Sequence, residues 1–366
     1  MAVKEAAGHG GNVYAAARDL QRPVGTILDF SASINPLGPS PDVSRTLAAG
    51  ARLIEHYPDP DCVSLREALA SRWKLSPEHF VIGNGSTELI DLIPRALRLR
   101  SALIVGPTFS EYADALHRAG VRSHTVFAVR SDGYRPPVEE VTRYVRLRGK
   151  TGQPPDSIFL CNPNSPTGQT FDRSELMSVI KKADRLRTWI ILDETFVEYC
   201  GECSMLPWLS QYPRLILLRS FTKFYALPGL RIGYSVSSPR TGTVLRQFQP
   251  PWSVNTLAQR AAEMAIRDHA HTRRSLKYLR LERERLVGKL SSLPGLVLFP
   301  SRTNFLLLEL PKPHRAGVVT AELRRQGLLI RDCSRVPGLT TRTIRVAIRA
   351  RSENDRLIAS FAKILR

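Results

Sequence analysis

Cysteine, acidic residues and long apolar runs are all scarce in this sequence of 366 residues. The five cysteines form an odd, scattered set, which excludes a small domain held together by disulfides. Cys200 and Cys203 form one C-x-x-C motif, but no second pair lies at the spacing of a zinc site. We therefore expect reduced thiols and no metal ion.

No apolar run approaches the roughly 18 residues that span a bilayer. The first residues, MAVKEAAGHGG, also lack the apolar stretch of a signal peptide. These absences predict a soluble, cytoplasmic protein with no membrane partner. Hydrophobic residues still make up 43% of the chain, enough to bury the cores of about two domains.

Basic residues outnumber acidic ones by 53 to 33, which gives a net charge of +20. Such an excess occurs in nucleic-acid-binding proteins. However, the sequence has no long basic run with interleaved aromatic residues, and only ten of the cations are lysine. A solvated, arginine-rich surface is the simpler interpretation, so we expect no nucleic-acid partner. An anionic small substrate is also compatible with this charge.

Short apolar strands alternate with amphipathic helices through the middle of the chain, which is typical of an α/β fold with a mainly parallel sheet. Seven strands are expected, at Phe80–Ile82, Ala102–Val105, Ser123–Ala128, Ile158–Leu160, Trp189–Leu192, Leu215–Leu218 and Arg231–Val236. After about residue 250, two long charged helices lead into a few short strands. This pattern predicts a large domain over 56–250, a smaller α+β domain over 251–366, and an N-terminal segment, 1–55, that packs on the smaller domain.

The strongest local signal for chemistry is Lys223, which follows the strand Leu215–Leu218 between apolar residues. Desolvation lowers the pKa of such an amine, as a nucleophile working near neutral pH requires. Ser220, Thr222 and Arg231 surround it with donors suited to a phosphate. Taken alone, the lysine is also compatible with a surface side chain that keeps its ammonium group in water.

Other strand ends carry polar groups as well. A glycine turn at Gly85, with Ser86 and Thr87, follows one strand and opens a helix, where backbone N–H groups favour an anion. Asp193 ends another strand, and taken alone a helix cap or an ion pair is its simpler role. If the ligand is a pyridine cofactor, this carboxylate would keep the ring nitrogen protonated. Phe109 offers an aromatic face for stacking or a core side chain.

These elements, with the loop Asn162-Pro-Asn-Ser-Pro-Thr-Gly168, come in the order found in the fold-type I pyridoxal-phosphate (PLP) enzymes of the aspartate aminotransferase superfamily, which the chain resembles over nearly its whole length. The resemblance implies a fold-type I PLP-dependent transferase, in which Lys223 holds the cofactor covalently and Asp193 contacts its ring nitrogen. Further cofactor contacts are implied for Gly85, Ser86, Thr87, Phe109, Ser165, Ser220, Thr222 and Arg231. Tyr57 matches a tyrosine that reaches the cofactor phosphate of the neighbouring subunit, which implies a homodimer with shared active sites.

The ends of the chain narrow the resemblance. The opening His9-Gly-Gly-Asn12 and the segment Asp29–Gly38 are similar to the L-threonine-O-3-phosphate decarboxylases of cobalamin biosynthesis. Phe196 agrees, because aminotransferases usually carry a tyrosine three residues after the aspartate. Contacts with a phosphorylated amino-acid substrate are implied for His9, Gly10, Ser33, Ser165, Arg331 and Arg345, of which Arg345 would bind the carboxylate through its guanidinium fork.

The resemblance implies decarboxylation of L-threonine O-3-phosphate to (R)-1-aminopropan-2-yl phosphate and CO2. Ser33 and Ser165 depart from the family pattern, which has asparagine at both positions, and each change removes an amide donor. Phosphoserine therefore stays open as a substrate. Transamination of histidinol phosphate is the alternative reaction, since the enzymes that catalyse it share much of the core.

Overall fold

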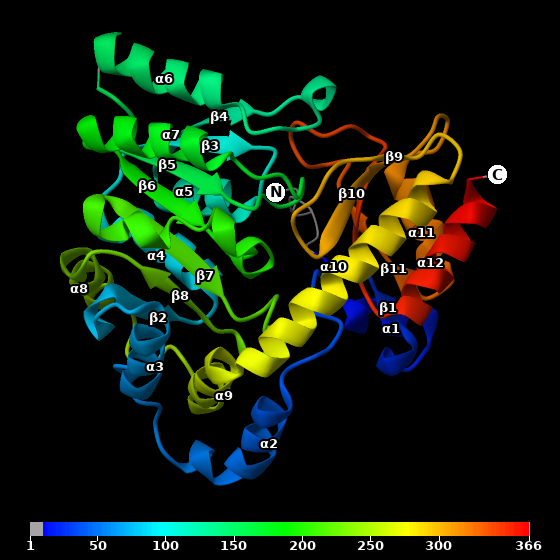
Figure 1. Ribbon diagram of the computed structural model, residues 1–366, viewed down its shortest axis with the longest axis horizontal. Coiled ribbons are helices and arrows are strands. Elements are labelled where there is room, and N and C mark those ends of the chain that lie inside the picture. Colours follow the sequence, from blue (N-terminus) through cyan, green and yellow to red (C-terminus); the bar gives the residue numbers. More distant parts are fainter. Residues whose placement is uncertain (1–9, 152, 366) are drawn as a thin grey trace, which may run out of the picture.

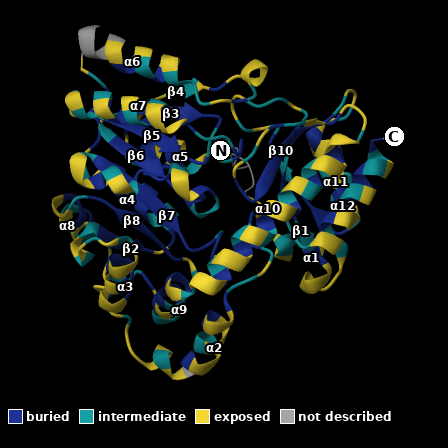
Figure 2. Cartoon of the chain, viewed as in Figure 1, coloured by how far each residue is buried: buried dark blue, intermediate teal, exposed yellow. Residues whose placement is uncertain are grey.

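The two larger β-sheets, of seven and four strands, lie side by side in this computed structural model, which describes residues 10–151 and 153–365. The long helix α10 (His269–Ser291) runs across the front of the molecule from one sheet toward the other (Figure 1). Burial is deepest within the two sheets, while the helices around them present exposed outer faces (Figure 2). Chemistry between the sheets can therefore draw on side chains from both.

The larger sheet has seven strands in the order β2-β8-β7-β6-β5-β3-β4. Their bounds are β2 Phe80–Gly83, β3 Ser101–Gly106, β4 Arg122–Phe127, β5 Ser157–Cys161, β6 Trp189–Asp193, β7 Leu215–Ser220 and β8 Gly233–Val236. Among these strands, β8 is the one whose direction is reversed, so it pairs antiparallel with both β2 and β7. The predicted mainly parallel, seven-stranded sheet is confirmed.

Helices cover both faces of this sheet because its central strands are apolar on both faces. On β5, Ile158 and Leu160 join the core on one face, while Phe159 joins the core on the other. The first face packs against α3 (Val63–Trp73), α6 (Val138–Thr151), α7 (Arg173–Arg185) and α9 (Thr256–Arg267). The second face packs against α4 (Ser86–Ala96), α5 (Glu111–Arg118) and α8 (Pro239–Gln247).

The smaller sheet is antiparallel, with the order β12-β13-β10-β9. Its strands are β9 Val297–Leu298, β10 Phe305–Glu309, β12 Arg331–Asp332 and β13 Thr343–Ala347. Alternate residues of β10 and β13, such as Leu306, Leu308 and Ile344, pack against α10, α11 (Ala316–Arg325) and α12 (Arg351–Ile364). The other face of β13 is left to carry Arg345.

The N-terminal segment divides between the two sheets. Helix α1 (Val13–Leu20) precedes β1 (Leu28–Asp29), which pairs with β11 (Leu328–Leu329) beside the smaller sheet. Helix α2 (Pro41–Ala49) instead contacts α9, and its Val43 is buried in the core of the larger sheet. The domain boundaries at 55 and 250 stay a prediction.

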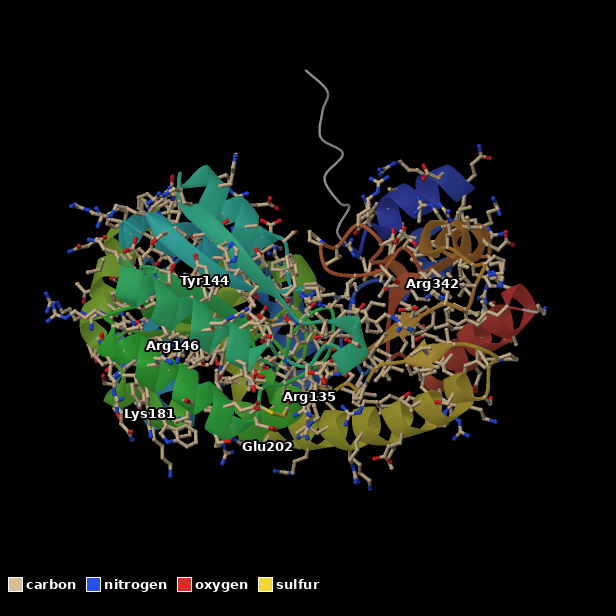
Figure 3. The ribbon with its side chains drawn as sticks, turned by 90° about the horizontal axis from the view of Figure 1, so that it is seen from above. Arg135, Tyr144, Arg146, Lys181, Glu202 and Arg342 are labelled. Atoms are coloured by element: carbon tan, nitrogen blue, oxygen red, sulfur yellow. A yellow bond between two sulfur atoms is a disulfide. The ribbon has the colours of Figure 1, made fainter. Side chains whose placement is uncertain are left out.

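One sequence expectation was wrong. Cys200 and Cys203 form a disulfide, whereas Cys62, Cys161 and Cys333 are free and buried. The 3-10 segment Val197–Cys203 is kinked at Cys200, and the Cα atoms of the two cysteines lie 5.5 Å apart, within the reach of a disulfide. Figure 3 shows the sulfur–sulfur bond close to the labelled Glu202. Among the described residues, no helix is both long and apolar enough to cross a membrane.

Candidate active site

A cavity of about 370 Å³ opens where the carboxyl ends of β5, β6 and β7 face the smaller sheet. Ligands bind at this edge in open α/β sheets. Most residues singled out in the sequence line this one cavity: Gly10, Ser33, Ser86, Thr87, Phe109, Ser165, Asp193, Ser220, Thr222, Lys223, Arg231, Arg331 and Arg345. Cations therefore outnumber the two acidic groups, Asp193 and Glu111, on the described walls.

Lys223 lies just after β7, and its backbone carbonyl accepts a hydrogen bond from Asn35 N at 3.0 Å. Asn35 is itself buried and donates from its side chain to Phe224 O at 2.9 Å, so the N-terminal segment holds the loop that carries the lysine. Burial lowers the pKa of Lys223 to about 8, and the nearby Arg345 and Arg231 add to the effect. A sizeable fraction of the amine is thus neutral near physiological pH.

Asp193 ends β6 and is buried, with a hydrogen bond to each carboxylate oxygen. The phenol of Tyr112 donates to Oδ2 at 2.6 Å, and the backbone N–H of Thr195 donates to Oδ1 at 2.8 Å. Desolvation raises the pKa of Asp193, while these donors oppose the rise. Both partners are neutral, so the ion pair considered from the sequence is absent among the described contacts.

The turn after β2 forms an anion cradle. Gly85 has φ +78°, and a Cβ there would lie 2.5 Å from Arg231 Nη2, so the guanidinium lies directly against the bare backbone. Helix α4 begins at the next residue, with its N–H groups pointing toward the cavity end. The hydroxyls of Ser220 and Thr222 lie 2.8 Å apart. This donor set fits a phosphate group.

Two arginines face the cavity from the smaller sheet, since Arg331 on β12 pairs in register with Arg345 on β13. Arg345 donates from Nη1 to Ser165 Oγ and from Nη2 to Ser31 O, both at 2.9 Å. Its buried Nε has no hydrogen-bond partner among the described residues. The Ser33 hydroxyl, also buried on the wall, has none either in this part of the chain. Both groups are placed to bind a ligand.

The family model for aminotransferase class I and II matches residues 25–361. The chain belongs to this family. The threonine-phosphate decarboxylase of Salmonella typhimurium is 39% identical over 98% of this chain and 96% of its own length.

Among solved structures, the L-threonine-O-3-phosphate decarboxylase of Porphyromonas gingivalis has a TM-score of 0.81 at 27% identity, and the histidinol-phosphate aminotransferase of Clostridium acetobutylicum has 0.85 at 26%. Each similarity covers 93% of this chain and 99% of the solved one. The fold-type I architecture is thus that of the aminotransferase class I and II family.

Two of the predicted site residues that the structure describes do not line the cavity. Gly85 lies behind the wall, with Arg231 against it. Tyr57 is 80% exposed and packs against Trp252, with ring centroids 4.9 Å apart. His9 lies outside the described residues.

Sequence reasoning also missed several wall residues: Ser31, Glu111, Tyr112, Cys161 and Thr195. Tyr112 lies on the first turn of α5, three residues after Phe109, which precedes the helix, and the two rings meet edge to face with centroids 5.8 Å apart. The close spacing of two aromatic residues was therefore a signal in the sequence. Ser31 had none, since its contribution is a backbone carbonyl for Arg345.

Proposed function

We propose that the protein is a PLP-dependent decarboxylase that converts L-threonine O-3-phosphate to (R)-1-aminopropan-2-yl phosphate and CO2. The observation that carries the proposal is one cavity in which a lysine of lowered pKa shares the walls with Asp193 and three arginines. The 39% identity to a threonine-phosphate decarboxylase over nearly the whole chain supports the choice of reaction.

The residues present fit PLP. The anion cradle of Gly85, Arg231 and the α4 N-terminus suits its phosphate, and the buried Asp193 suits its ring nitrogen. Phe109 lines the cavity where it can stack on the ring. When bound to Lys223, PLP withdraws electrons from the Cα of an amino acid, which makes loss of a carboxylate possible.

The two remaining arginines suit the two anionic ends of the substrate. Two of the five guanidinium N–H groups of Arg345 are used by Ser165 and Ser31, which leaves donors for the α-carboxylate. Arg331 lies across the same strand pair and is available for the substrate phosphate. Holding both ends fixes which bond at Cα is broken. The amine of Lys223 then delivers a proton to Cα in place of the lost CO2.

Product analysis tests the reaction and the substrate together. The purified protein with PLP is incubated separately with phosphothreonine, with phosphoserine, and with histidinol phosphate plus 2-oxoglutarate. We expect CO2 and an amine phosphate from phosphothreonine. We expect no transfer of the amino group of histidinol phosphate to 2-oxoglutarate. Glutamate formed from histidinol phosphate without CO2 release would instead make the protein an aminotransferase, and CO2 from phosphoserine alone would change the substrate.

A homodimer with shared active sites belongs to the same proposal, as do a cytoplasmic location and the absence of a nucleic-acid partner. The exposed aromatic pair of Tyr57 and Trp252, with exposed Ile54 and Val63 on the same stretch of chain, supports a subunit interface there. Mixing two inactive variants, Tyr57→Ala and Lys223→Ala, tests it: hybrid dimers should regain activity because one site is intact. No recovery after subunit exchange would contradict the sharing.

A further inference from the structure

Tyr112 lines the cavity, and sequence reasoning assigned no role to this residue. Its ring is 1% exposed and lies between Phe109 and Phe159, with centroids 5.8 Å from each. From this fixed position the phenol donates to Asp193 Oδ2 at 2.6 Å. A ring held between two aromatic neighbours keeps its phenol oxygen within hydrogen-bond distance of Asp193.

A buried carboxylate keeps its charge only if donors offset its loss of water. Among the described residues two donors reach Asp193, and Tyr112 supplies the one to Oδ2 from its side chain. The nearby Cys161 lines the same wall, but its Sγ donates to Pro163 O at 3.3 Å. The titratable groups that face Asp193 are therefore Tyr112 on α5, Cys161 on β5 and Lys223 after β7.

A phenol suits this task because it is a neutral donor. Burial, together with the Asp193 charge, raises the pKa of Tyr112 well above its usual value, so the O–H stays protonated at any working pH. A cationic partner would instead cancel the negative charge that a ring nitrogen needs to meet. The hydrogen bond therefore aims the carboxylate without neutralising it.

We propose that Tyr112 is a positioning residue that holds Asp193 ionised and aimed at the ring nitrogen of the cofactor, and so sets cofactor affinity and the protonation of the ring. This inference rests on the proposed function. Tyr112 acts through Asp193, so its effect should disappear when Asp193 can no longer carry a charge.

The test measures PLP binding and not only turnover. Tyr112→Phe removes one oxygen, and Tyr134→Phe is the matched control, because Tyr134 is equally buried at 1% exposure but lies in a separate cluster outside the cavity. Titration of the cofactor-free proteins with PLP should show about 10-fold or more weaker binding for Tyr112→Phe. Affinity should be unchanged for Tyr134→Phe. The pH at which the absorbance of the bound cofactor changes should shift in Tyr112→Phe and stay at the wild-type value in Tyr134→Phe.

The same change made in an Asp193→Asn background decides whether Tyr112 acts through Asp193. We expect less than a twofold further loss of PLP affinity there. Unchanged affinity and an unchanged pH titration in Tyr112→Phe, or an equally large loss in the Asp193→Asn background, would overturn the inference while the proposed function stands. Wild-type protein that binds no PLP would overturn both.

Discussion

Two buried or partly buried arginines, one on each sheet, differ in what they contact. Arg219 on β7 is 2% exposed and donates to Glu194 at 2.7 Å, with Ser204 as a further partner at 2.7 Å. Arg345 on β13 donates hydrogen bonds only to neutral oxygens among the described residues, at Ser165 and Ser31. Arg219 is therefore neutralised within the protein, whereas Arg345 keeps N–H donors for a ligand.

The same contrast appears between neighbouring carboxylates at the end of β6. Glu194 points away from the cavity, where it accepts from Arg219, from Ser204 and from Met205 N. Asp193, one residue earlier, points into the cavity, and its hydrogen-bond donors among the described residues are neutral. Side chains alternate along a strand, so one residue of difference places a charge on opposite faces of the sheet. In this comparison, the charges that form an ion pair stabilise the fold, whereas the charges with neutral partners face the cavity where a ligand would bind.

Breaking the structural pair should have the largest effect on folding. Arg219→Met leaves Glu194 buried without its cation, which costs about 3–5 kcal/mol in the free energy of unfolding. Urea denaturation measures the loss. The double variant Arg219→Met with Glu194→Leu should recover much of it, because no unpaired charge remains. Equal instability in the single and double variants would show that packing, not charge, is responsible.

The same substitution on the other sheet should leave folding intact and remove function. Arg345→Met deletes a buried charge that forms no ion pair among the described residues, so the free energy of unfolding should stay the same or rise. The value of kcat/KM for phosphothreonine should fall by about 100-fold or more, since a carboxylate loses its charge-assisted partner. A large loss of stability with normal kinetics would reverse the comparison.

The contrast also shows what the sequence could predict. Strand periodicity located all seven strands of the larger sheet to within two residues, and the rule that ligands bind at strand ends brought Asp193, Ser220 and Lys223 to one edge. The antiparallel direction of β8 was not encoded in its short apolar pattern. Helix α2 likewise lies on α9 because of tertiary packing that its own residues do not specify.

Contacts that depend on the folded backbone were beyond reach from the sequence. The Cys200–Cys203 disulfide depends on the kinked 3-10 segment that holds the two residues close together. The spacing of the cysteines in the sequence had instead favoured free thiols. The hydrogen bond of Tyr112 joins α5 to the end of β6 across 81 residues of sequence, so it became visible only in the folded chain. Local residue patterns predict which side chains could bind a ligand or take part in catalysis. The tertiary structure decides which of these side chains are paired within the protein and which face the cavity.

A smaller effect is expected for the second cation of the smaller sheet. Arg331→Ala should raise KM for phosphothreonine about 10- to 100-fold, because the substrate phosphate loses a charged donor worth about 1.5–3 kcal/mol. The KM for an uncharged-tail substrate, such as threonine, should change little. A KM for phosphothreonine that does not change would remove Arg331 from the substrate site.

The smallest effect sharpens the comparison through pH. Lys223 contacts the ligand cavity as Arg345 does, and burial lowers its pKa from 10.5 to about 8. Without PLP, the unfolded chain therefore holds more protons than the folded protein between about pH 8 and 10.5, so Lys223 contributes a free energy of unfolding that rises with pH across this window.

Comparing urea denaturation of the wild type and Lys223→Met at pH 7.5 and 9.5 isolates this contribution, since other titrating groups are common to both proteins. The difference in unfolding free energy should shift by about 1–2 kcal/mol in favour of the wild type at the higher pH. Parallel profiles would mean that the amine is solvated like a surface lysine, and that burial does not prepare it as a nucleophile.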